Sequence, residues 1–121
     1  MHLRVSAAVL LAVVTAGCGS SSNSSMTTPS PSGGQTVTIV SGAQSMTTTA
    51  YSPNPVTVSV GTTITWVNND NTAHTATSNS GGFDTGTISA GGQVSRQFNN
   101  AGSFPYHCTI HPNMVATINV Q

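Results

Sequence analysis

A cysteine, a histidine and a methionine follow one another at three-residue spacing near the end of the chain, as Cys108, His111 and Met114. A second histidine, His74, lies on a separate upstream segment. Together these side chains offer one thiolate, two imidazoles and one thioether. Two histidines and one cysteine with a weak axial methionine form the ligand set of a copper electron-transfer site. Magnesium and calcium prefer oxygen ligands, and zinc rarely takes a thioether. The residue types therefore predict one copper ion that changes redox state in place.

The order of these residues along the chain also suits a common site. Phe104, Tyr106 and Cys108 share one parity, so on a strand all three face the interior. Cys108 is then the last inward residue before a turn that contains His111, and the next strand is expected over residues 114–120. Such a loop can bring three side chains to one point, with His74 closing the site from a neighbouring strand. The alternative is a buried free cysteine beside an unrelated histidine and a core methionine.

Three segments of the sequence resemble one known family. Residues 106–114, YHCTIHPNM, are similar to the copper loop of amicyanin and of small bacterial plastocyanin-like cupredoxins. Residues 66–74, WVNNDNTAH, and residues 51–56, YSPNPV, resemble the same family. The resemblance covers residues 35–121. It implies an all-β, cupredoxin-like Greek-key β-sandwich, one type 1 copper ion and single-electron transfer.

Two positions of the chain depart from the family pattern beside the expected ligands. Amicyanin-like loops have proline where this chain has Ile110, and many relatives have asparagine where it has Thr75. Proline has no backbone N–H, whereas isoleucine has one. By analogy with cupredoxins that lack this proline, we expect the Ile110 N–H to approach the sulfur of Cys108 beside the Thr75 N–H. Such hydrogen bonds would tune the copper.

The expected secondary structure consists of short strands. Val, Ile and Thr alternate with period two between Gly, Asn and Pro signals, which is the pattern of strands and turns. Strands are predicted over residues 62–68 and 93–98, with another ending at Cys108 and an extended segment over residues 74–78. Helical periodicity is found only at the N-terminus. Seven to eight strands at this spacing predict a β-sandwich with Greek-key connections, with Trp66 in its core.

The N-terminus reads as an export signal. A basic start is followed by an apolar run over residues 5–14, which is too short for a membrane span of about 20 residues and is typical of a signal peptide. The sequence TAGC at residues 15–18 resembles a bacterial lipobox, in which the cysteine is lipidated. We therefore expect residues 1–17 to be a lipoprotein signal peptide and Cys18 to carry the lipid. The alternative is an ordinary secreted protein that is cut nearby.

A linker and one domain follow the expected cleavage site. Residues 18–34 begin with the lipidated cysteine and are otherwise rich in Ser, Thr, Pro and Gly, so a flexible tether is expected. Residues 35–121 form the expected copper-binding domain. With Cys18 acylated, Cys108 has no intramolecular partner in a compartment where disulfides persist. Metal ligation would protect this unpaired thiol from oxidation, which supports the copper interpretation.

Charge excludes several classes of partner. The part of the chain after Cys18 has one cation, Arg96, and two anions, Asp70 and Asp84. This excludes a basic surface for nucleic acid and a polybasic membrane patch, and it makes long-range steering of a partner weak. Both aspartates lie in turn sequences, where Asp hydrogen-bonds its own backbone. We expect a monomer.

Three functions fit a copper site of this kind. A one-electron carrier would dock transiently to a donor and an acceptor redox protein near His111, at the membrane surface. A copper chaperone or storage protein would instead use open sites rich in Met and His. An enzyme would need a second copper centre with extra histidines, and only His107 is left over after residue 18. The sequence favours the carrier, in a bacterial protein exported to the periplasm or cell surface and anchored by lipid.

Overall fold

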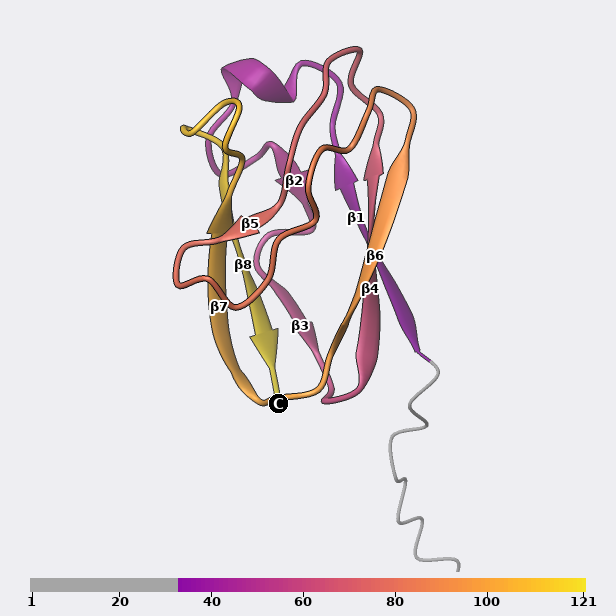
Figure 1. Cartoon of the computed structure of the whole chain (residues 1–121), viewed down its shortest axis with the longest axis vertical. Helices are drawn as coiled ribbons and strands as arrows, with labels where there is room; N and C mark the ends of the chain where they lie inside the picture. The colour runs from indigo at the N-terminus through magenta and orange to yellow at the C-terminus, as the bar shows by residue number, and fades with distance from the viewer. Residues whose placement is uncertain (1–32) are drawn as a thin grey trace, which may run out of the picture.

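The computed structural model describes residues 33–121. These residues form eight strands in two four-stranded sheets, together with one turn of 3-10 helix, Ala43–Ser45 (Figure 1). The prediction of an all-β sandwich of seven to eight strands is therefore confirmed. The expected signal peptide, Cys18 and the linker as far as residue 32 lie outside the described residues.

The first sheet has the strand order β2-β1-β4-β6. Strand β1 (Gly34–Ile39) runs parallel to β4 (Thr62–Asn68) and antiparallel to β2 (Tyr51–Ser52). Strand β6 (Gln93–Phe98) pairs antiparallel with the other side of β4. The structure gives β4 and β6 the bounds predicted from the sequence, because alternating side chains between turn residues define both strands.

The second sheet has the strand order β3-β8-β7-β5. Strand β7 (Gly102–His107) is antiparallel to both of its neighbours, β8 (Val115–Val120) and β5 (Thr77–Ser78). Strand β3 (Val56–Val58) pairs parallel with β8. Strand β5 is shorter than the extended segment predicted over residues 74–78. Residues 74–76 lie in the β4–β5 loop, where His74 makes an isolated bridge to Ile88.

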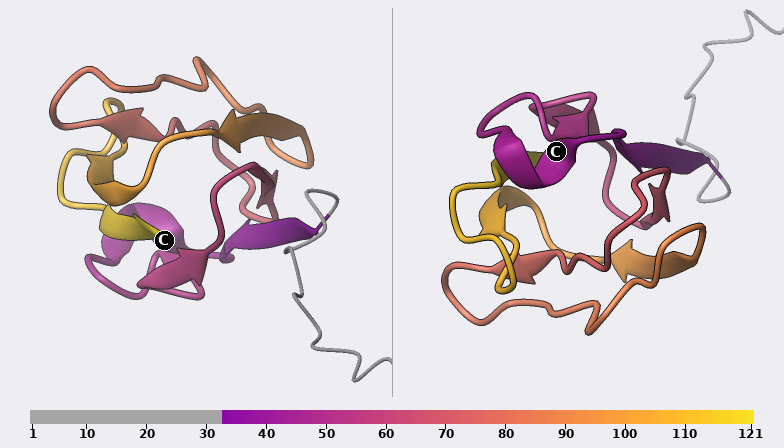
Figure 2. Two further views of the ribbon diagram at one scale, coloured as in Figure 1. Left: turned by 90° about the horizontal axis from the view of Figure 1, so that it is seen from below. Right: turned by 90° about the horizontal axis from the view of Figure 1, so that it is seen from above.

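The two sheets face each other and enclose the core, as the views along the long axis show (Figure 2). Trp66 is fully buried, as predicted. The six aromatic residues of the chain form one connected group with ring centroids 4.9 to 6.3 Å apart. The members of this group are Tyr51, Trp66, Phe83, Phe98, Phe104 and Tyr106. Each such ring pair contributes about 0.5–1.5 kcal/mol beyond burial.

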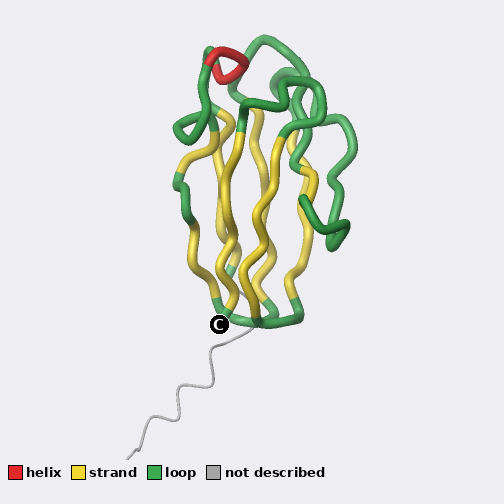
Figure 3. The backbone as a smooth tube through the Cα atoms, turned by 90° about the vertical axis from the view of Figure 1, so that its left-hand side faces the viewer, coloured by secondary structure: helices red, strands yellow, loops and turns green. Residues whose placement is uncertain are grey.

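Three loops gather at one end of the sandwich, away from the C-terminus (Figure 3). They are the β1–β2 connection with the 3-10 turn, the β4–β5 loop and the β7–β8 loop. The sheets form a rigid frame below them, so side chains on separate loops can be held at fixed distances. Within residues 33–121, no helix is long and apolar enough to cross a membrane.

Candidate metal centre

Cys108 stands at the first position after β7 and is fully buried as a free thiol. The strand parity predicted from the sequence holds, because Tyr106 is buried as well. The residue between them, His107, points the other way, and its Nδ1 atom lies 2.6 Å from the exposed Asn79 Oδ1. Two backbone hydrogen bonds close the loop: Cys108 N–H donates to Met114 O at 3.1 Å, and Met114 N–H donates to His111 O at 3.0 Å. The loop is thus a tight turn that returns directly into β8.

Two backbone N–H groups donate to the Cys108 sulfur. One is the N–H of Thr75, 3.3 Å from Sγ, as predicted. The second is the N–H of His111, at 3.4 Å, so the prediction that Ile110 supplies this donor is wrong. The reason is local: the chain turns after the cysteine, and a side-chain acceptor at the start of a turn reaches the N–H three residues on, as an N-cap does. Ile110 is 46% exposed on the outside of that turn.

His74 lies in the β4–β5 loop and is fully buried. An isolated antiparallel bridge holds its backbone against Ile88: His74 N–H donates to Ile88 O at 3.1 Å, and Ile88 N–H donates to His74 O at 2.7 Å. The loop preceding it is braced by Asn68, whose side-chain amide donates to Thr72 O and Ile88 O at 2.8 and 3.0 Å. The backbone of this histidine is therefore fixed on both sides by hydrogen bonds.

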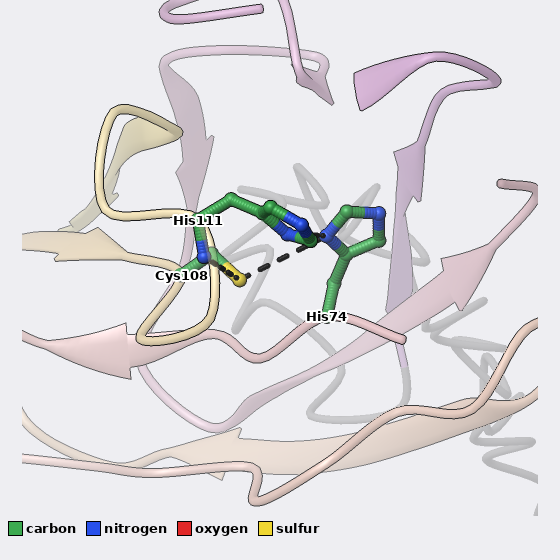
Figure 4. A group of neighbouring side chains, drawn as sticks. All are labelled: His74, Cys108 and His111. Carbon is green, nitrogen blue, oxygen red and sulfur yellow. Dashed lines mark hydrogen bonds between the residues drawn. The ribbon is translucent and has the colours of Figure 1, made fainter. Parts of the chain in front are cut away.

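Three predicted ligand atoms converge between these loops. His74 Nδ1 lies 3.8 Å from Cys108 Sγ and 3.2 Å from His111 Nδ1, and the three atoms all lie within 4.8 Å of one another. Figure 4 shows the three side chains pointing toward one another from the two loops. A soft thiolate with two imidazoles suits copper, and a buried free thiol without a disulfide partner matches a metal ligand. The donor set therefore fits a copper ion.

Met114, the predicted axial ligand, is fully buried immediately before β8, which begins one residue later than the strand predicted over residues 114–120. Its backbone is bonded to both other ligand residues of the loop, through Cys108 N–H and His111 O. The loop thus carries this thioether on the same short turn as Cys108 and His111. Ligation by Met114 remains a prediction.

Thr75 joins the two ligand loops. Its hydroxyl oxygen accepts the Thr109 N–H at 2.9 Å and lies 3.2 Å from the Thr109 hydroxyl. The same oxygen lies 3.0 Å from Thr77 Oγ1, whose hydroxyl donates to Asp84 Oδ1 at 3.1 Å. Thr75 therefore ties the turn after Cys108 to the segment after His74, in addition to donating its N–H to the sulfur.

Two tyrosines close the site from inside the sandwich. The buried Tyr51 hydroxyl donates to the Thr75 carbonyl oxygen, and Trp66 Nε1 donates to the Tyr106 hydroxyl at 3.3 Å. Removal from water raises the pKa of both phenols, and the proximity of Cys108 adds to the rise in the pKa of Tyr51. Both phenols therefore stay neutral at ordinary pH.

Sequence reasoning missed Asp70 as part of the site. Its Oδ2 lies 2.8 Å from His74 Nε2, on the far side of the ring from the sulfur, and both side chains are buried. Its Oδ1 accepts the N–H groups of Gly42 and Asn71 at 3.0 and 2.9 Å. These hydrogen bonds, chiefly the one from His74 and then the one from Gly42, lower the pKa of the carboxyl to about 2. The aspartate is thus ionised and acts only as an acceptor.

Comparison with known protein families identifies the family to which the chain belongs. The model of the cupredoxin-like domain matches residues 7–120. The chain belongs to the cupredoxin-like family. The resemblance drawn from the loop sequence is therefore confirmed at the level of the family. No curated protein matches this cupredoxin significantly.

Solved structures resemble this cupredoxin over most of its length. A purple cupredoxin from Nitrosopumilus maritimus is 29% identical with a TM-score of 0.66, and the match covers 72% of this chain and 99% of that one. An oxidised amicyanin variant is 28% identical with a TM-score of 0.63, covering 74% and 83%. A copper-containing nitrite reductase from Thermus scotoductus is 26% identical with a TM-score of 0.60, and the match covers 72% of this chain but 22% of that enzyme.

Proposed function

We propose that this cupredoxin is a one-electron carrier with a single type 1 copper ion held by His74, Cys108, His111 and Met114. The observation that carries the proposal is the convergence of one buried sulfur and two ring nitrogens within 4.8 Å. A solved neighbour with 28% identity is the Cu(I) form of an amicyanin variant. When bound, the ion would supply a reversible Cu(II)/Cu(I) couple.

The chain's own residues favour rapid exchange of one electron. The backbone of His74 is fixed by Ile88, and the sulfur of Cys108 is fixed by two N–H donors. Ligands held this firmly keep one geometry in both redox states, so little has to rearrange when an electron arrives or leaves. Burial of Cys108 excludes water, which also protects the thiol from oxidation.

A docking surface around His111 fits this role. His111 is half-buried, and its neighbours Ile110, Pro112 and Asn113 are exposed. This rim is weakly polar and carries no charged side chain. A small uncharged surface suits short-lived encounters with a donor and an acceptor redox protein. We propose that electrons pass through the His111 ring at this surface, and that the protein works as a monomer.

The alternative of copper delivery or storage fits the geometry less well. A protein that hands on its metal would use an open site rich in Met and His, at which a second protein can begin to compete. Here Cys108 and His74 are both fully buried. Catalysis at a second copper centre would need further histidines, and the remaining histidine of the described residues, His107, lies on the outside with its ring bonded to Asn79. The carrier therefore remains the preferred function.

We also propose where the carrier works. The lipobox-like sequence at residues 15–18 supports lipidation of Cys18, and the segment as far as residue 34 would tether the domain to a bacterial membrane. Its partners would then be redox proteins of the periplasm or cell surface. This proposal rests on the sequence of residues 1–34.

The visible spectrum and voltammetry of the copper-loaded protein test the function. A carrier should show intense absorption from the thiolate–Cu(II) bond and a reversible one-electron wave. A copper-handling protein should bind Cu(I) without colour and lose it rapidly to a competing chelator. Colourless binding with fast exchange would overturn the carrier proposal.

A further inference from the structure

The two carboxylate oxygens of Asp70 contact different groups: one faces backbone N–H groups and the other faces the His74 ring. Oδ1 accepts two backbone N–H groups, from Gly42 and Asn71. Oδ2 faces His74 Nε2 at 2.8 Å. Gly42 comes from the distant β1–β2 connection and adopts a left-handed conformation with φ of 79°. The orientation of this carboxylate is therefore fixed from a part of the chain outside the ligand loops.

This arrangement decides which ring nitrogen of His74 carries the proton. A neutral imidazole has one N–H and one bare nitrogen. Because an ionised carboxylate can only accept a hydrogen bond, the nitrogen facing Asp70 must be the donor. Nε2 is then protonated, and Nδ1 is left bare toward Cys108 and His111.

The short distance between the two histidines is compatible with the same assignment. His74 Nδ1 and His111 Nδ1 lie 3.2 Å apart. Two bare nitrogens would repel each other at that distance, and so would two N–H groups. In the copper-free protein one of the pair must then donate, and Asp70 assigns the acceptor role to His74. With copper bound, both nitrogens would be bare. A bare Nδ1 is also what a metal ion requires of a histidine ligand.

We propose that Asp70 is a positioning residue that holds His74 in the tautomer ready for metal, with Nε2–H directed at the carboxylate and Nδ1 free. The importance of this for copper binding rests on the proposed function. The position of the proton, by contrast, is a property of the copper-free protein and can be measured there.

Asp70→Asn is the decisive variant because it nearly preserves the shape of the side chain. Two buried N–H groups need an oxygen at the Oδ1 position, whereas one group faces the Oδ2 position. The new amide should keep its oxygen toward Gly42 and Asn71 and turn its NH₂ toward His74. Nε2 must then accept, so the proton moves to Nδ1 and blocks the ligand position. Asp70→Ala removes the acceptor without imposing this conflict.

The ¹⁵N NMR shifts of the His74 ring in the copper-free protein test the proposal directly, at a pH of about 8, where an ordinary histidine is neutral. The wild type should show Nε2–H, and Asp70→Asn should show Nδ1–H. Copper affinity, measured by chelator competition, should fall about 10- to 100-fold in Asp70→Asn and less in Asp70→Ala. Asp84→Asn is the matched control, since it loses the same charge at an exposed position and should resemble the wild type in both measurements.

Two results would overturn the proposal. One is a bare Nε2 in the wild-type copper-free protein, which needs no variant and so does not depend on the folding of one. The other is an Asp70→Asn variant that binds copper as well as Asp70→Ala or better. If the wild type shows Nε2–H but never develops thiolate–copper absorption, the proposed function fails and the role of Asp70 stands.

Discussion

The backbone N–H of His111 donates to the sulfur of Cys108 at 3.4 Å. His111 therefore contacts the thiol through its main chain, while its ring is an expected copper ligand. The second N–H at the sulfur comes from Thr75 at 3.3 Å, on the other ligand loop. Hydrogen bonds to a thiolate withdraw charge from sulfur and weaken its donation to Cu(II). The reduction potential should therefore depend on these two donors.

The first prediction concerns Ile110, whose N–H was expected at the sulfur by analogy with other cupredoxins. Since His111 provides that hydrogen bond, Ile110→Pro removes no donor from Cys108. We expect the reduction potential and the visible spectrum to stay within error of the wild-type values in voltammetry and absorption. Ile110→Ala is the control, because it trims the same exposed side chain and keeps the N–H. A lower reduction potential in the proline variant, but not in the alanine variant, would show that the Ile110 N–H does donate to the sulfur.

The second prediction concerns the thiol itself. Cys108→Ser replaces a soft anionic ligand with a neutral hydroxyl, and the strong sulfur–copper absorption has no other source in the described site. The variant should bind copper as a pale Cu(II) centre, with its intense colour lost. His107→Ala, which alters the adjacent outward-facing residue, should keep the wild-type spectrum. Persistence of the intense absorption in Cys108→Ser would show that the ligand assignment is wrong.

The third prediction concerns the link between the two ligand loops. Thr75→Val keeps the shape of the side chain and its N–H to sulfur but removes the oxygen that accepts the Thr109 N–H. Leaving a partly buried donor unpaired should lower the free energy of unfolding by about 1–2 kcal/mol. Urea unfolding of the copper-free protein measures this loss.

The control for this change is Thr75→Asn, since many relatives have asparagine after the first histidine ligand. Its amide oxygen can accept the Thr109 N–H again, so most of the stability should return. Equal stability of the valine variant and the wild type would mean that Thr75 Oγ1 does not hold the turn after Cys108.

Much of this structure could be predicted from short-range patterns. The bounds of β4 and β6 followed from alternating residues between turn signals, and the chemistry of the ligands followed from their types and spacing. Cys108, His111 and Met114 lie on one short loop, so their proximity is nearly a local property of the chain. That His74 would join them was inferred only from its residue type as the second imidazole, because its position depends on how two separate loops meet.

The features that were missed depend on contacts that a sequence does not display. Asp70 looked like a turn residue, and its hydrogen bond to the Asn71 N–H is of that kind. Its contact with His74 four residues on would follow from sequence only on a helix, and here it is made by an irregular loop. Its contact with Gly42 joins residues 28 positions apart. The choice between Ile110 and His111 as donor was set by the path of one turn.

The fourth prediction concerns the N-terminal segment, outside the described residues. If Cys18 is lipidated, Cys18→Ala should remove the lipid and leave the protein either uncut or released in soluble form. The apolar run over residues 5–14 cannot replace the anchor, because a span needs about 20 residues. Membrane fractionation and mass spectrometry of the N-terminus check this. Unchanged membrane partition in the variant would remove the proposed lipid anchor.

The fifth prediction concerns alkaline pH. The chain has two tyrosines, Tyr51 and Tyr106, and burial raises the pKa of both in the folded protein. In the unfolded chain a tyrosine ionises near pH 10. A raised pKa in the folded state means that its contribution to stability is complete below about pH 10 and is lost as the pH rises further. Each tyrosine should then lower the free energy of unfolding by about 1.4 kcal/mol per pH unit.

Absorbance and circular dichroism, followed together through an alkaline titration, measure this effect. The folded copper-free protein should show no tyrosinate absorbance near pH 10, and both phenols should ionise in one step as the protein unfolds. The same chain in concentrated urea is the control and should titrate near pH 10 from the start. One tyrosine ionising at its ordinary pKa while the circular dichroism stays native would show that its hydroxyl is not enclosed. Because the Tyr51 hydroxyl is bonded to the Thr75 carbonyl, early ionisation of Tyr51 would also mean that the core side of the site is open to water.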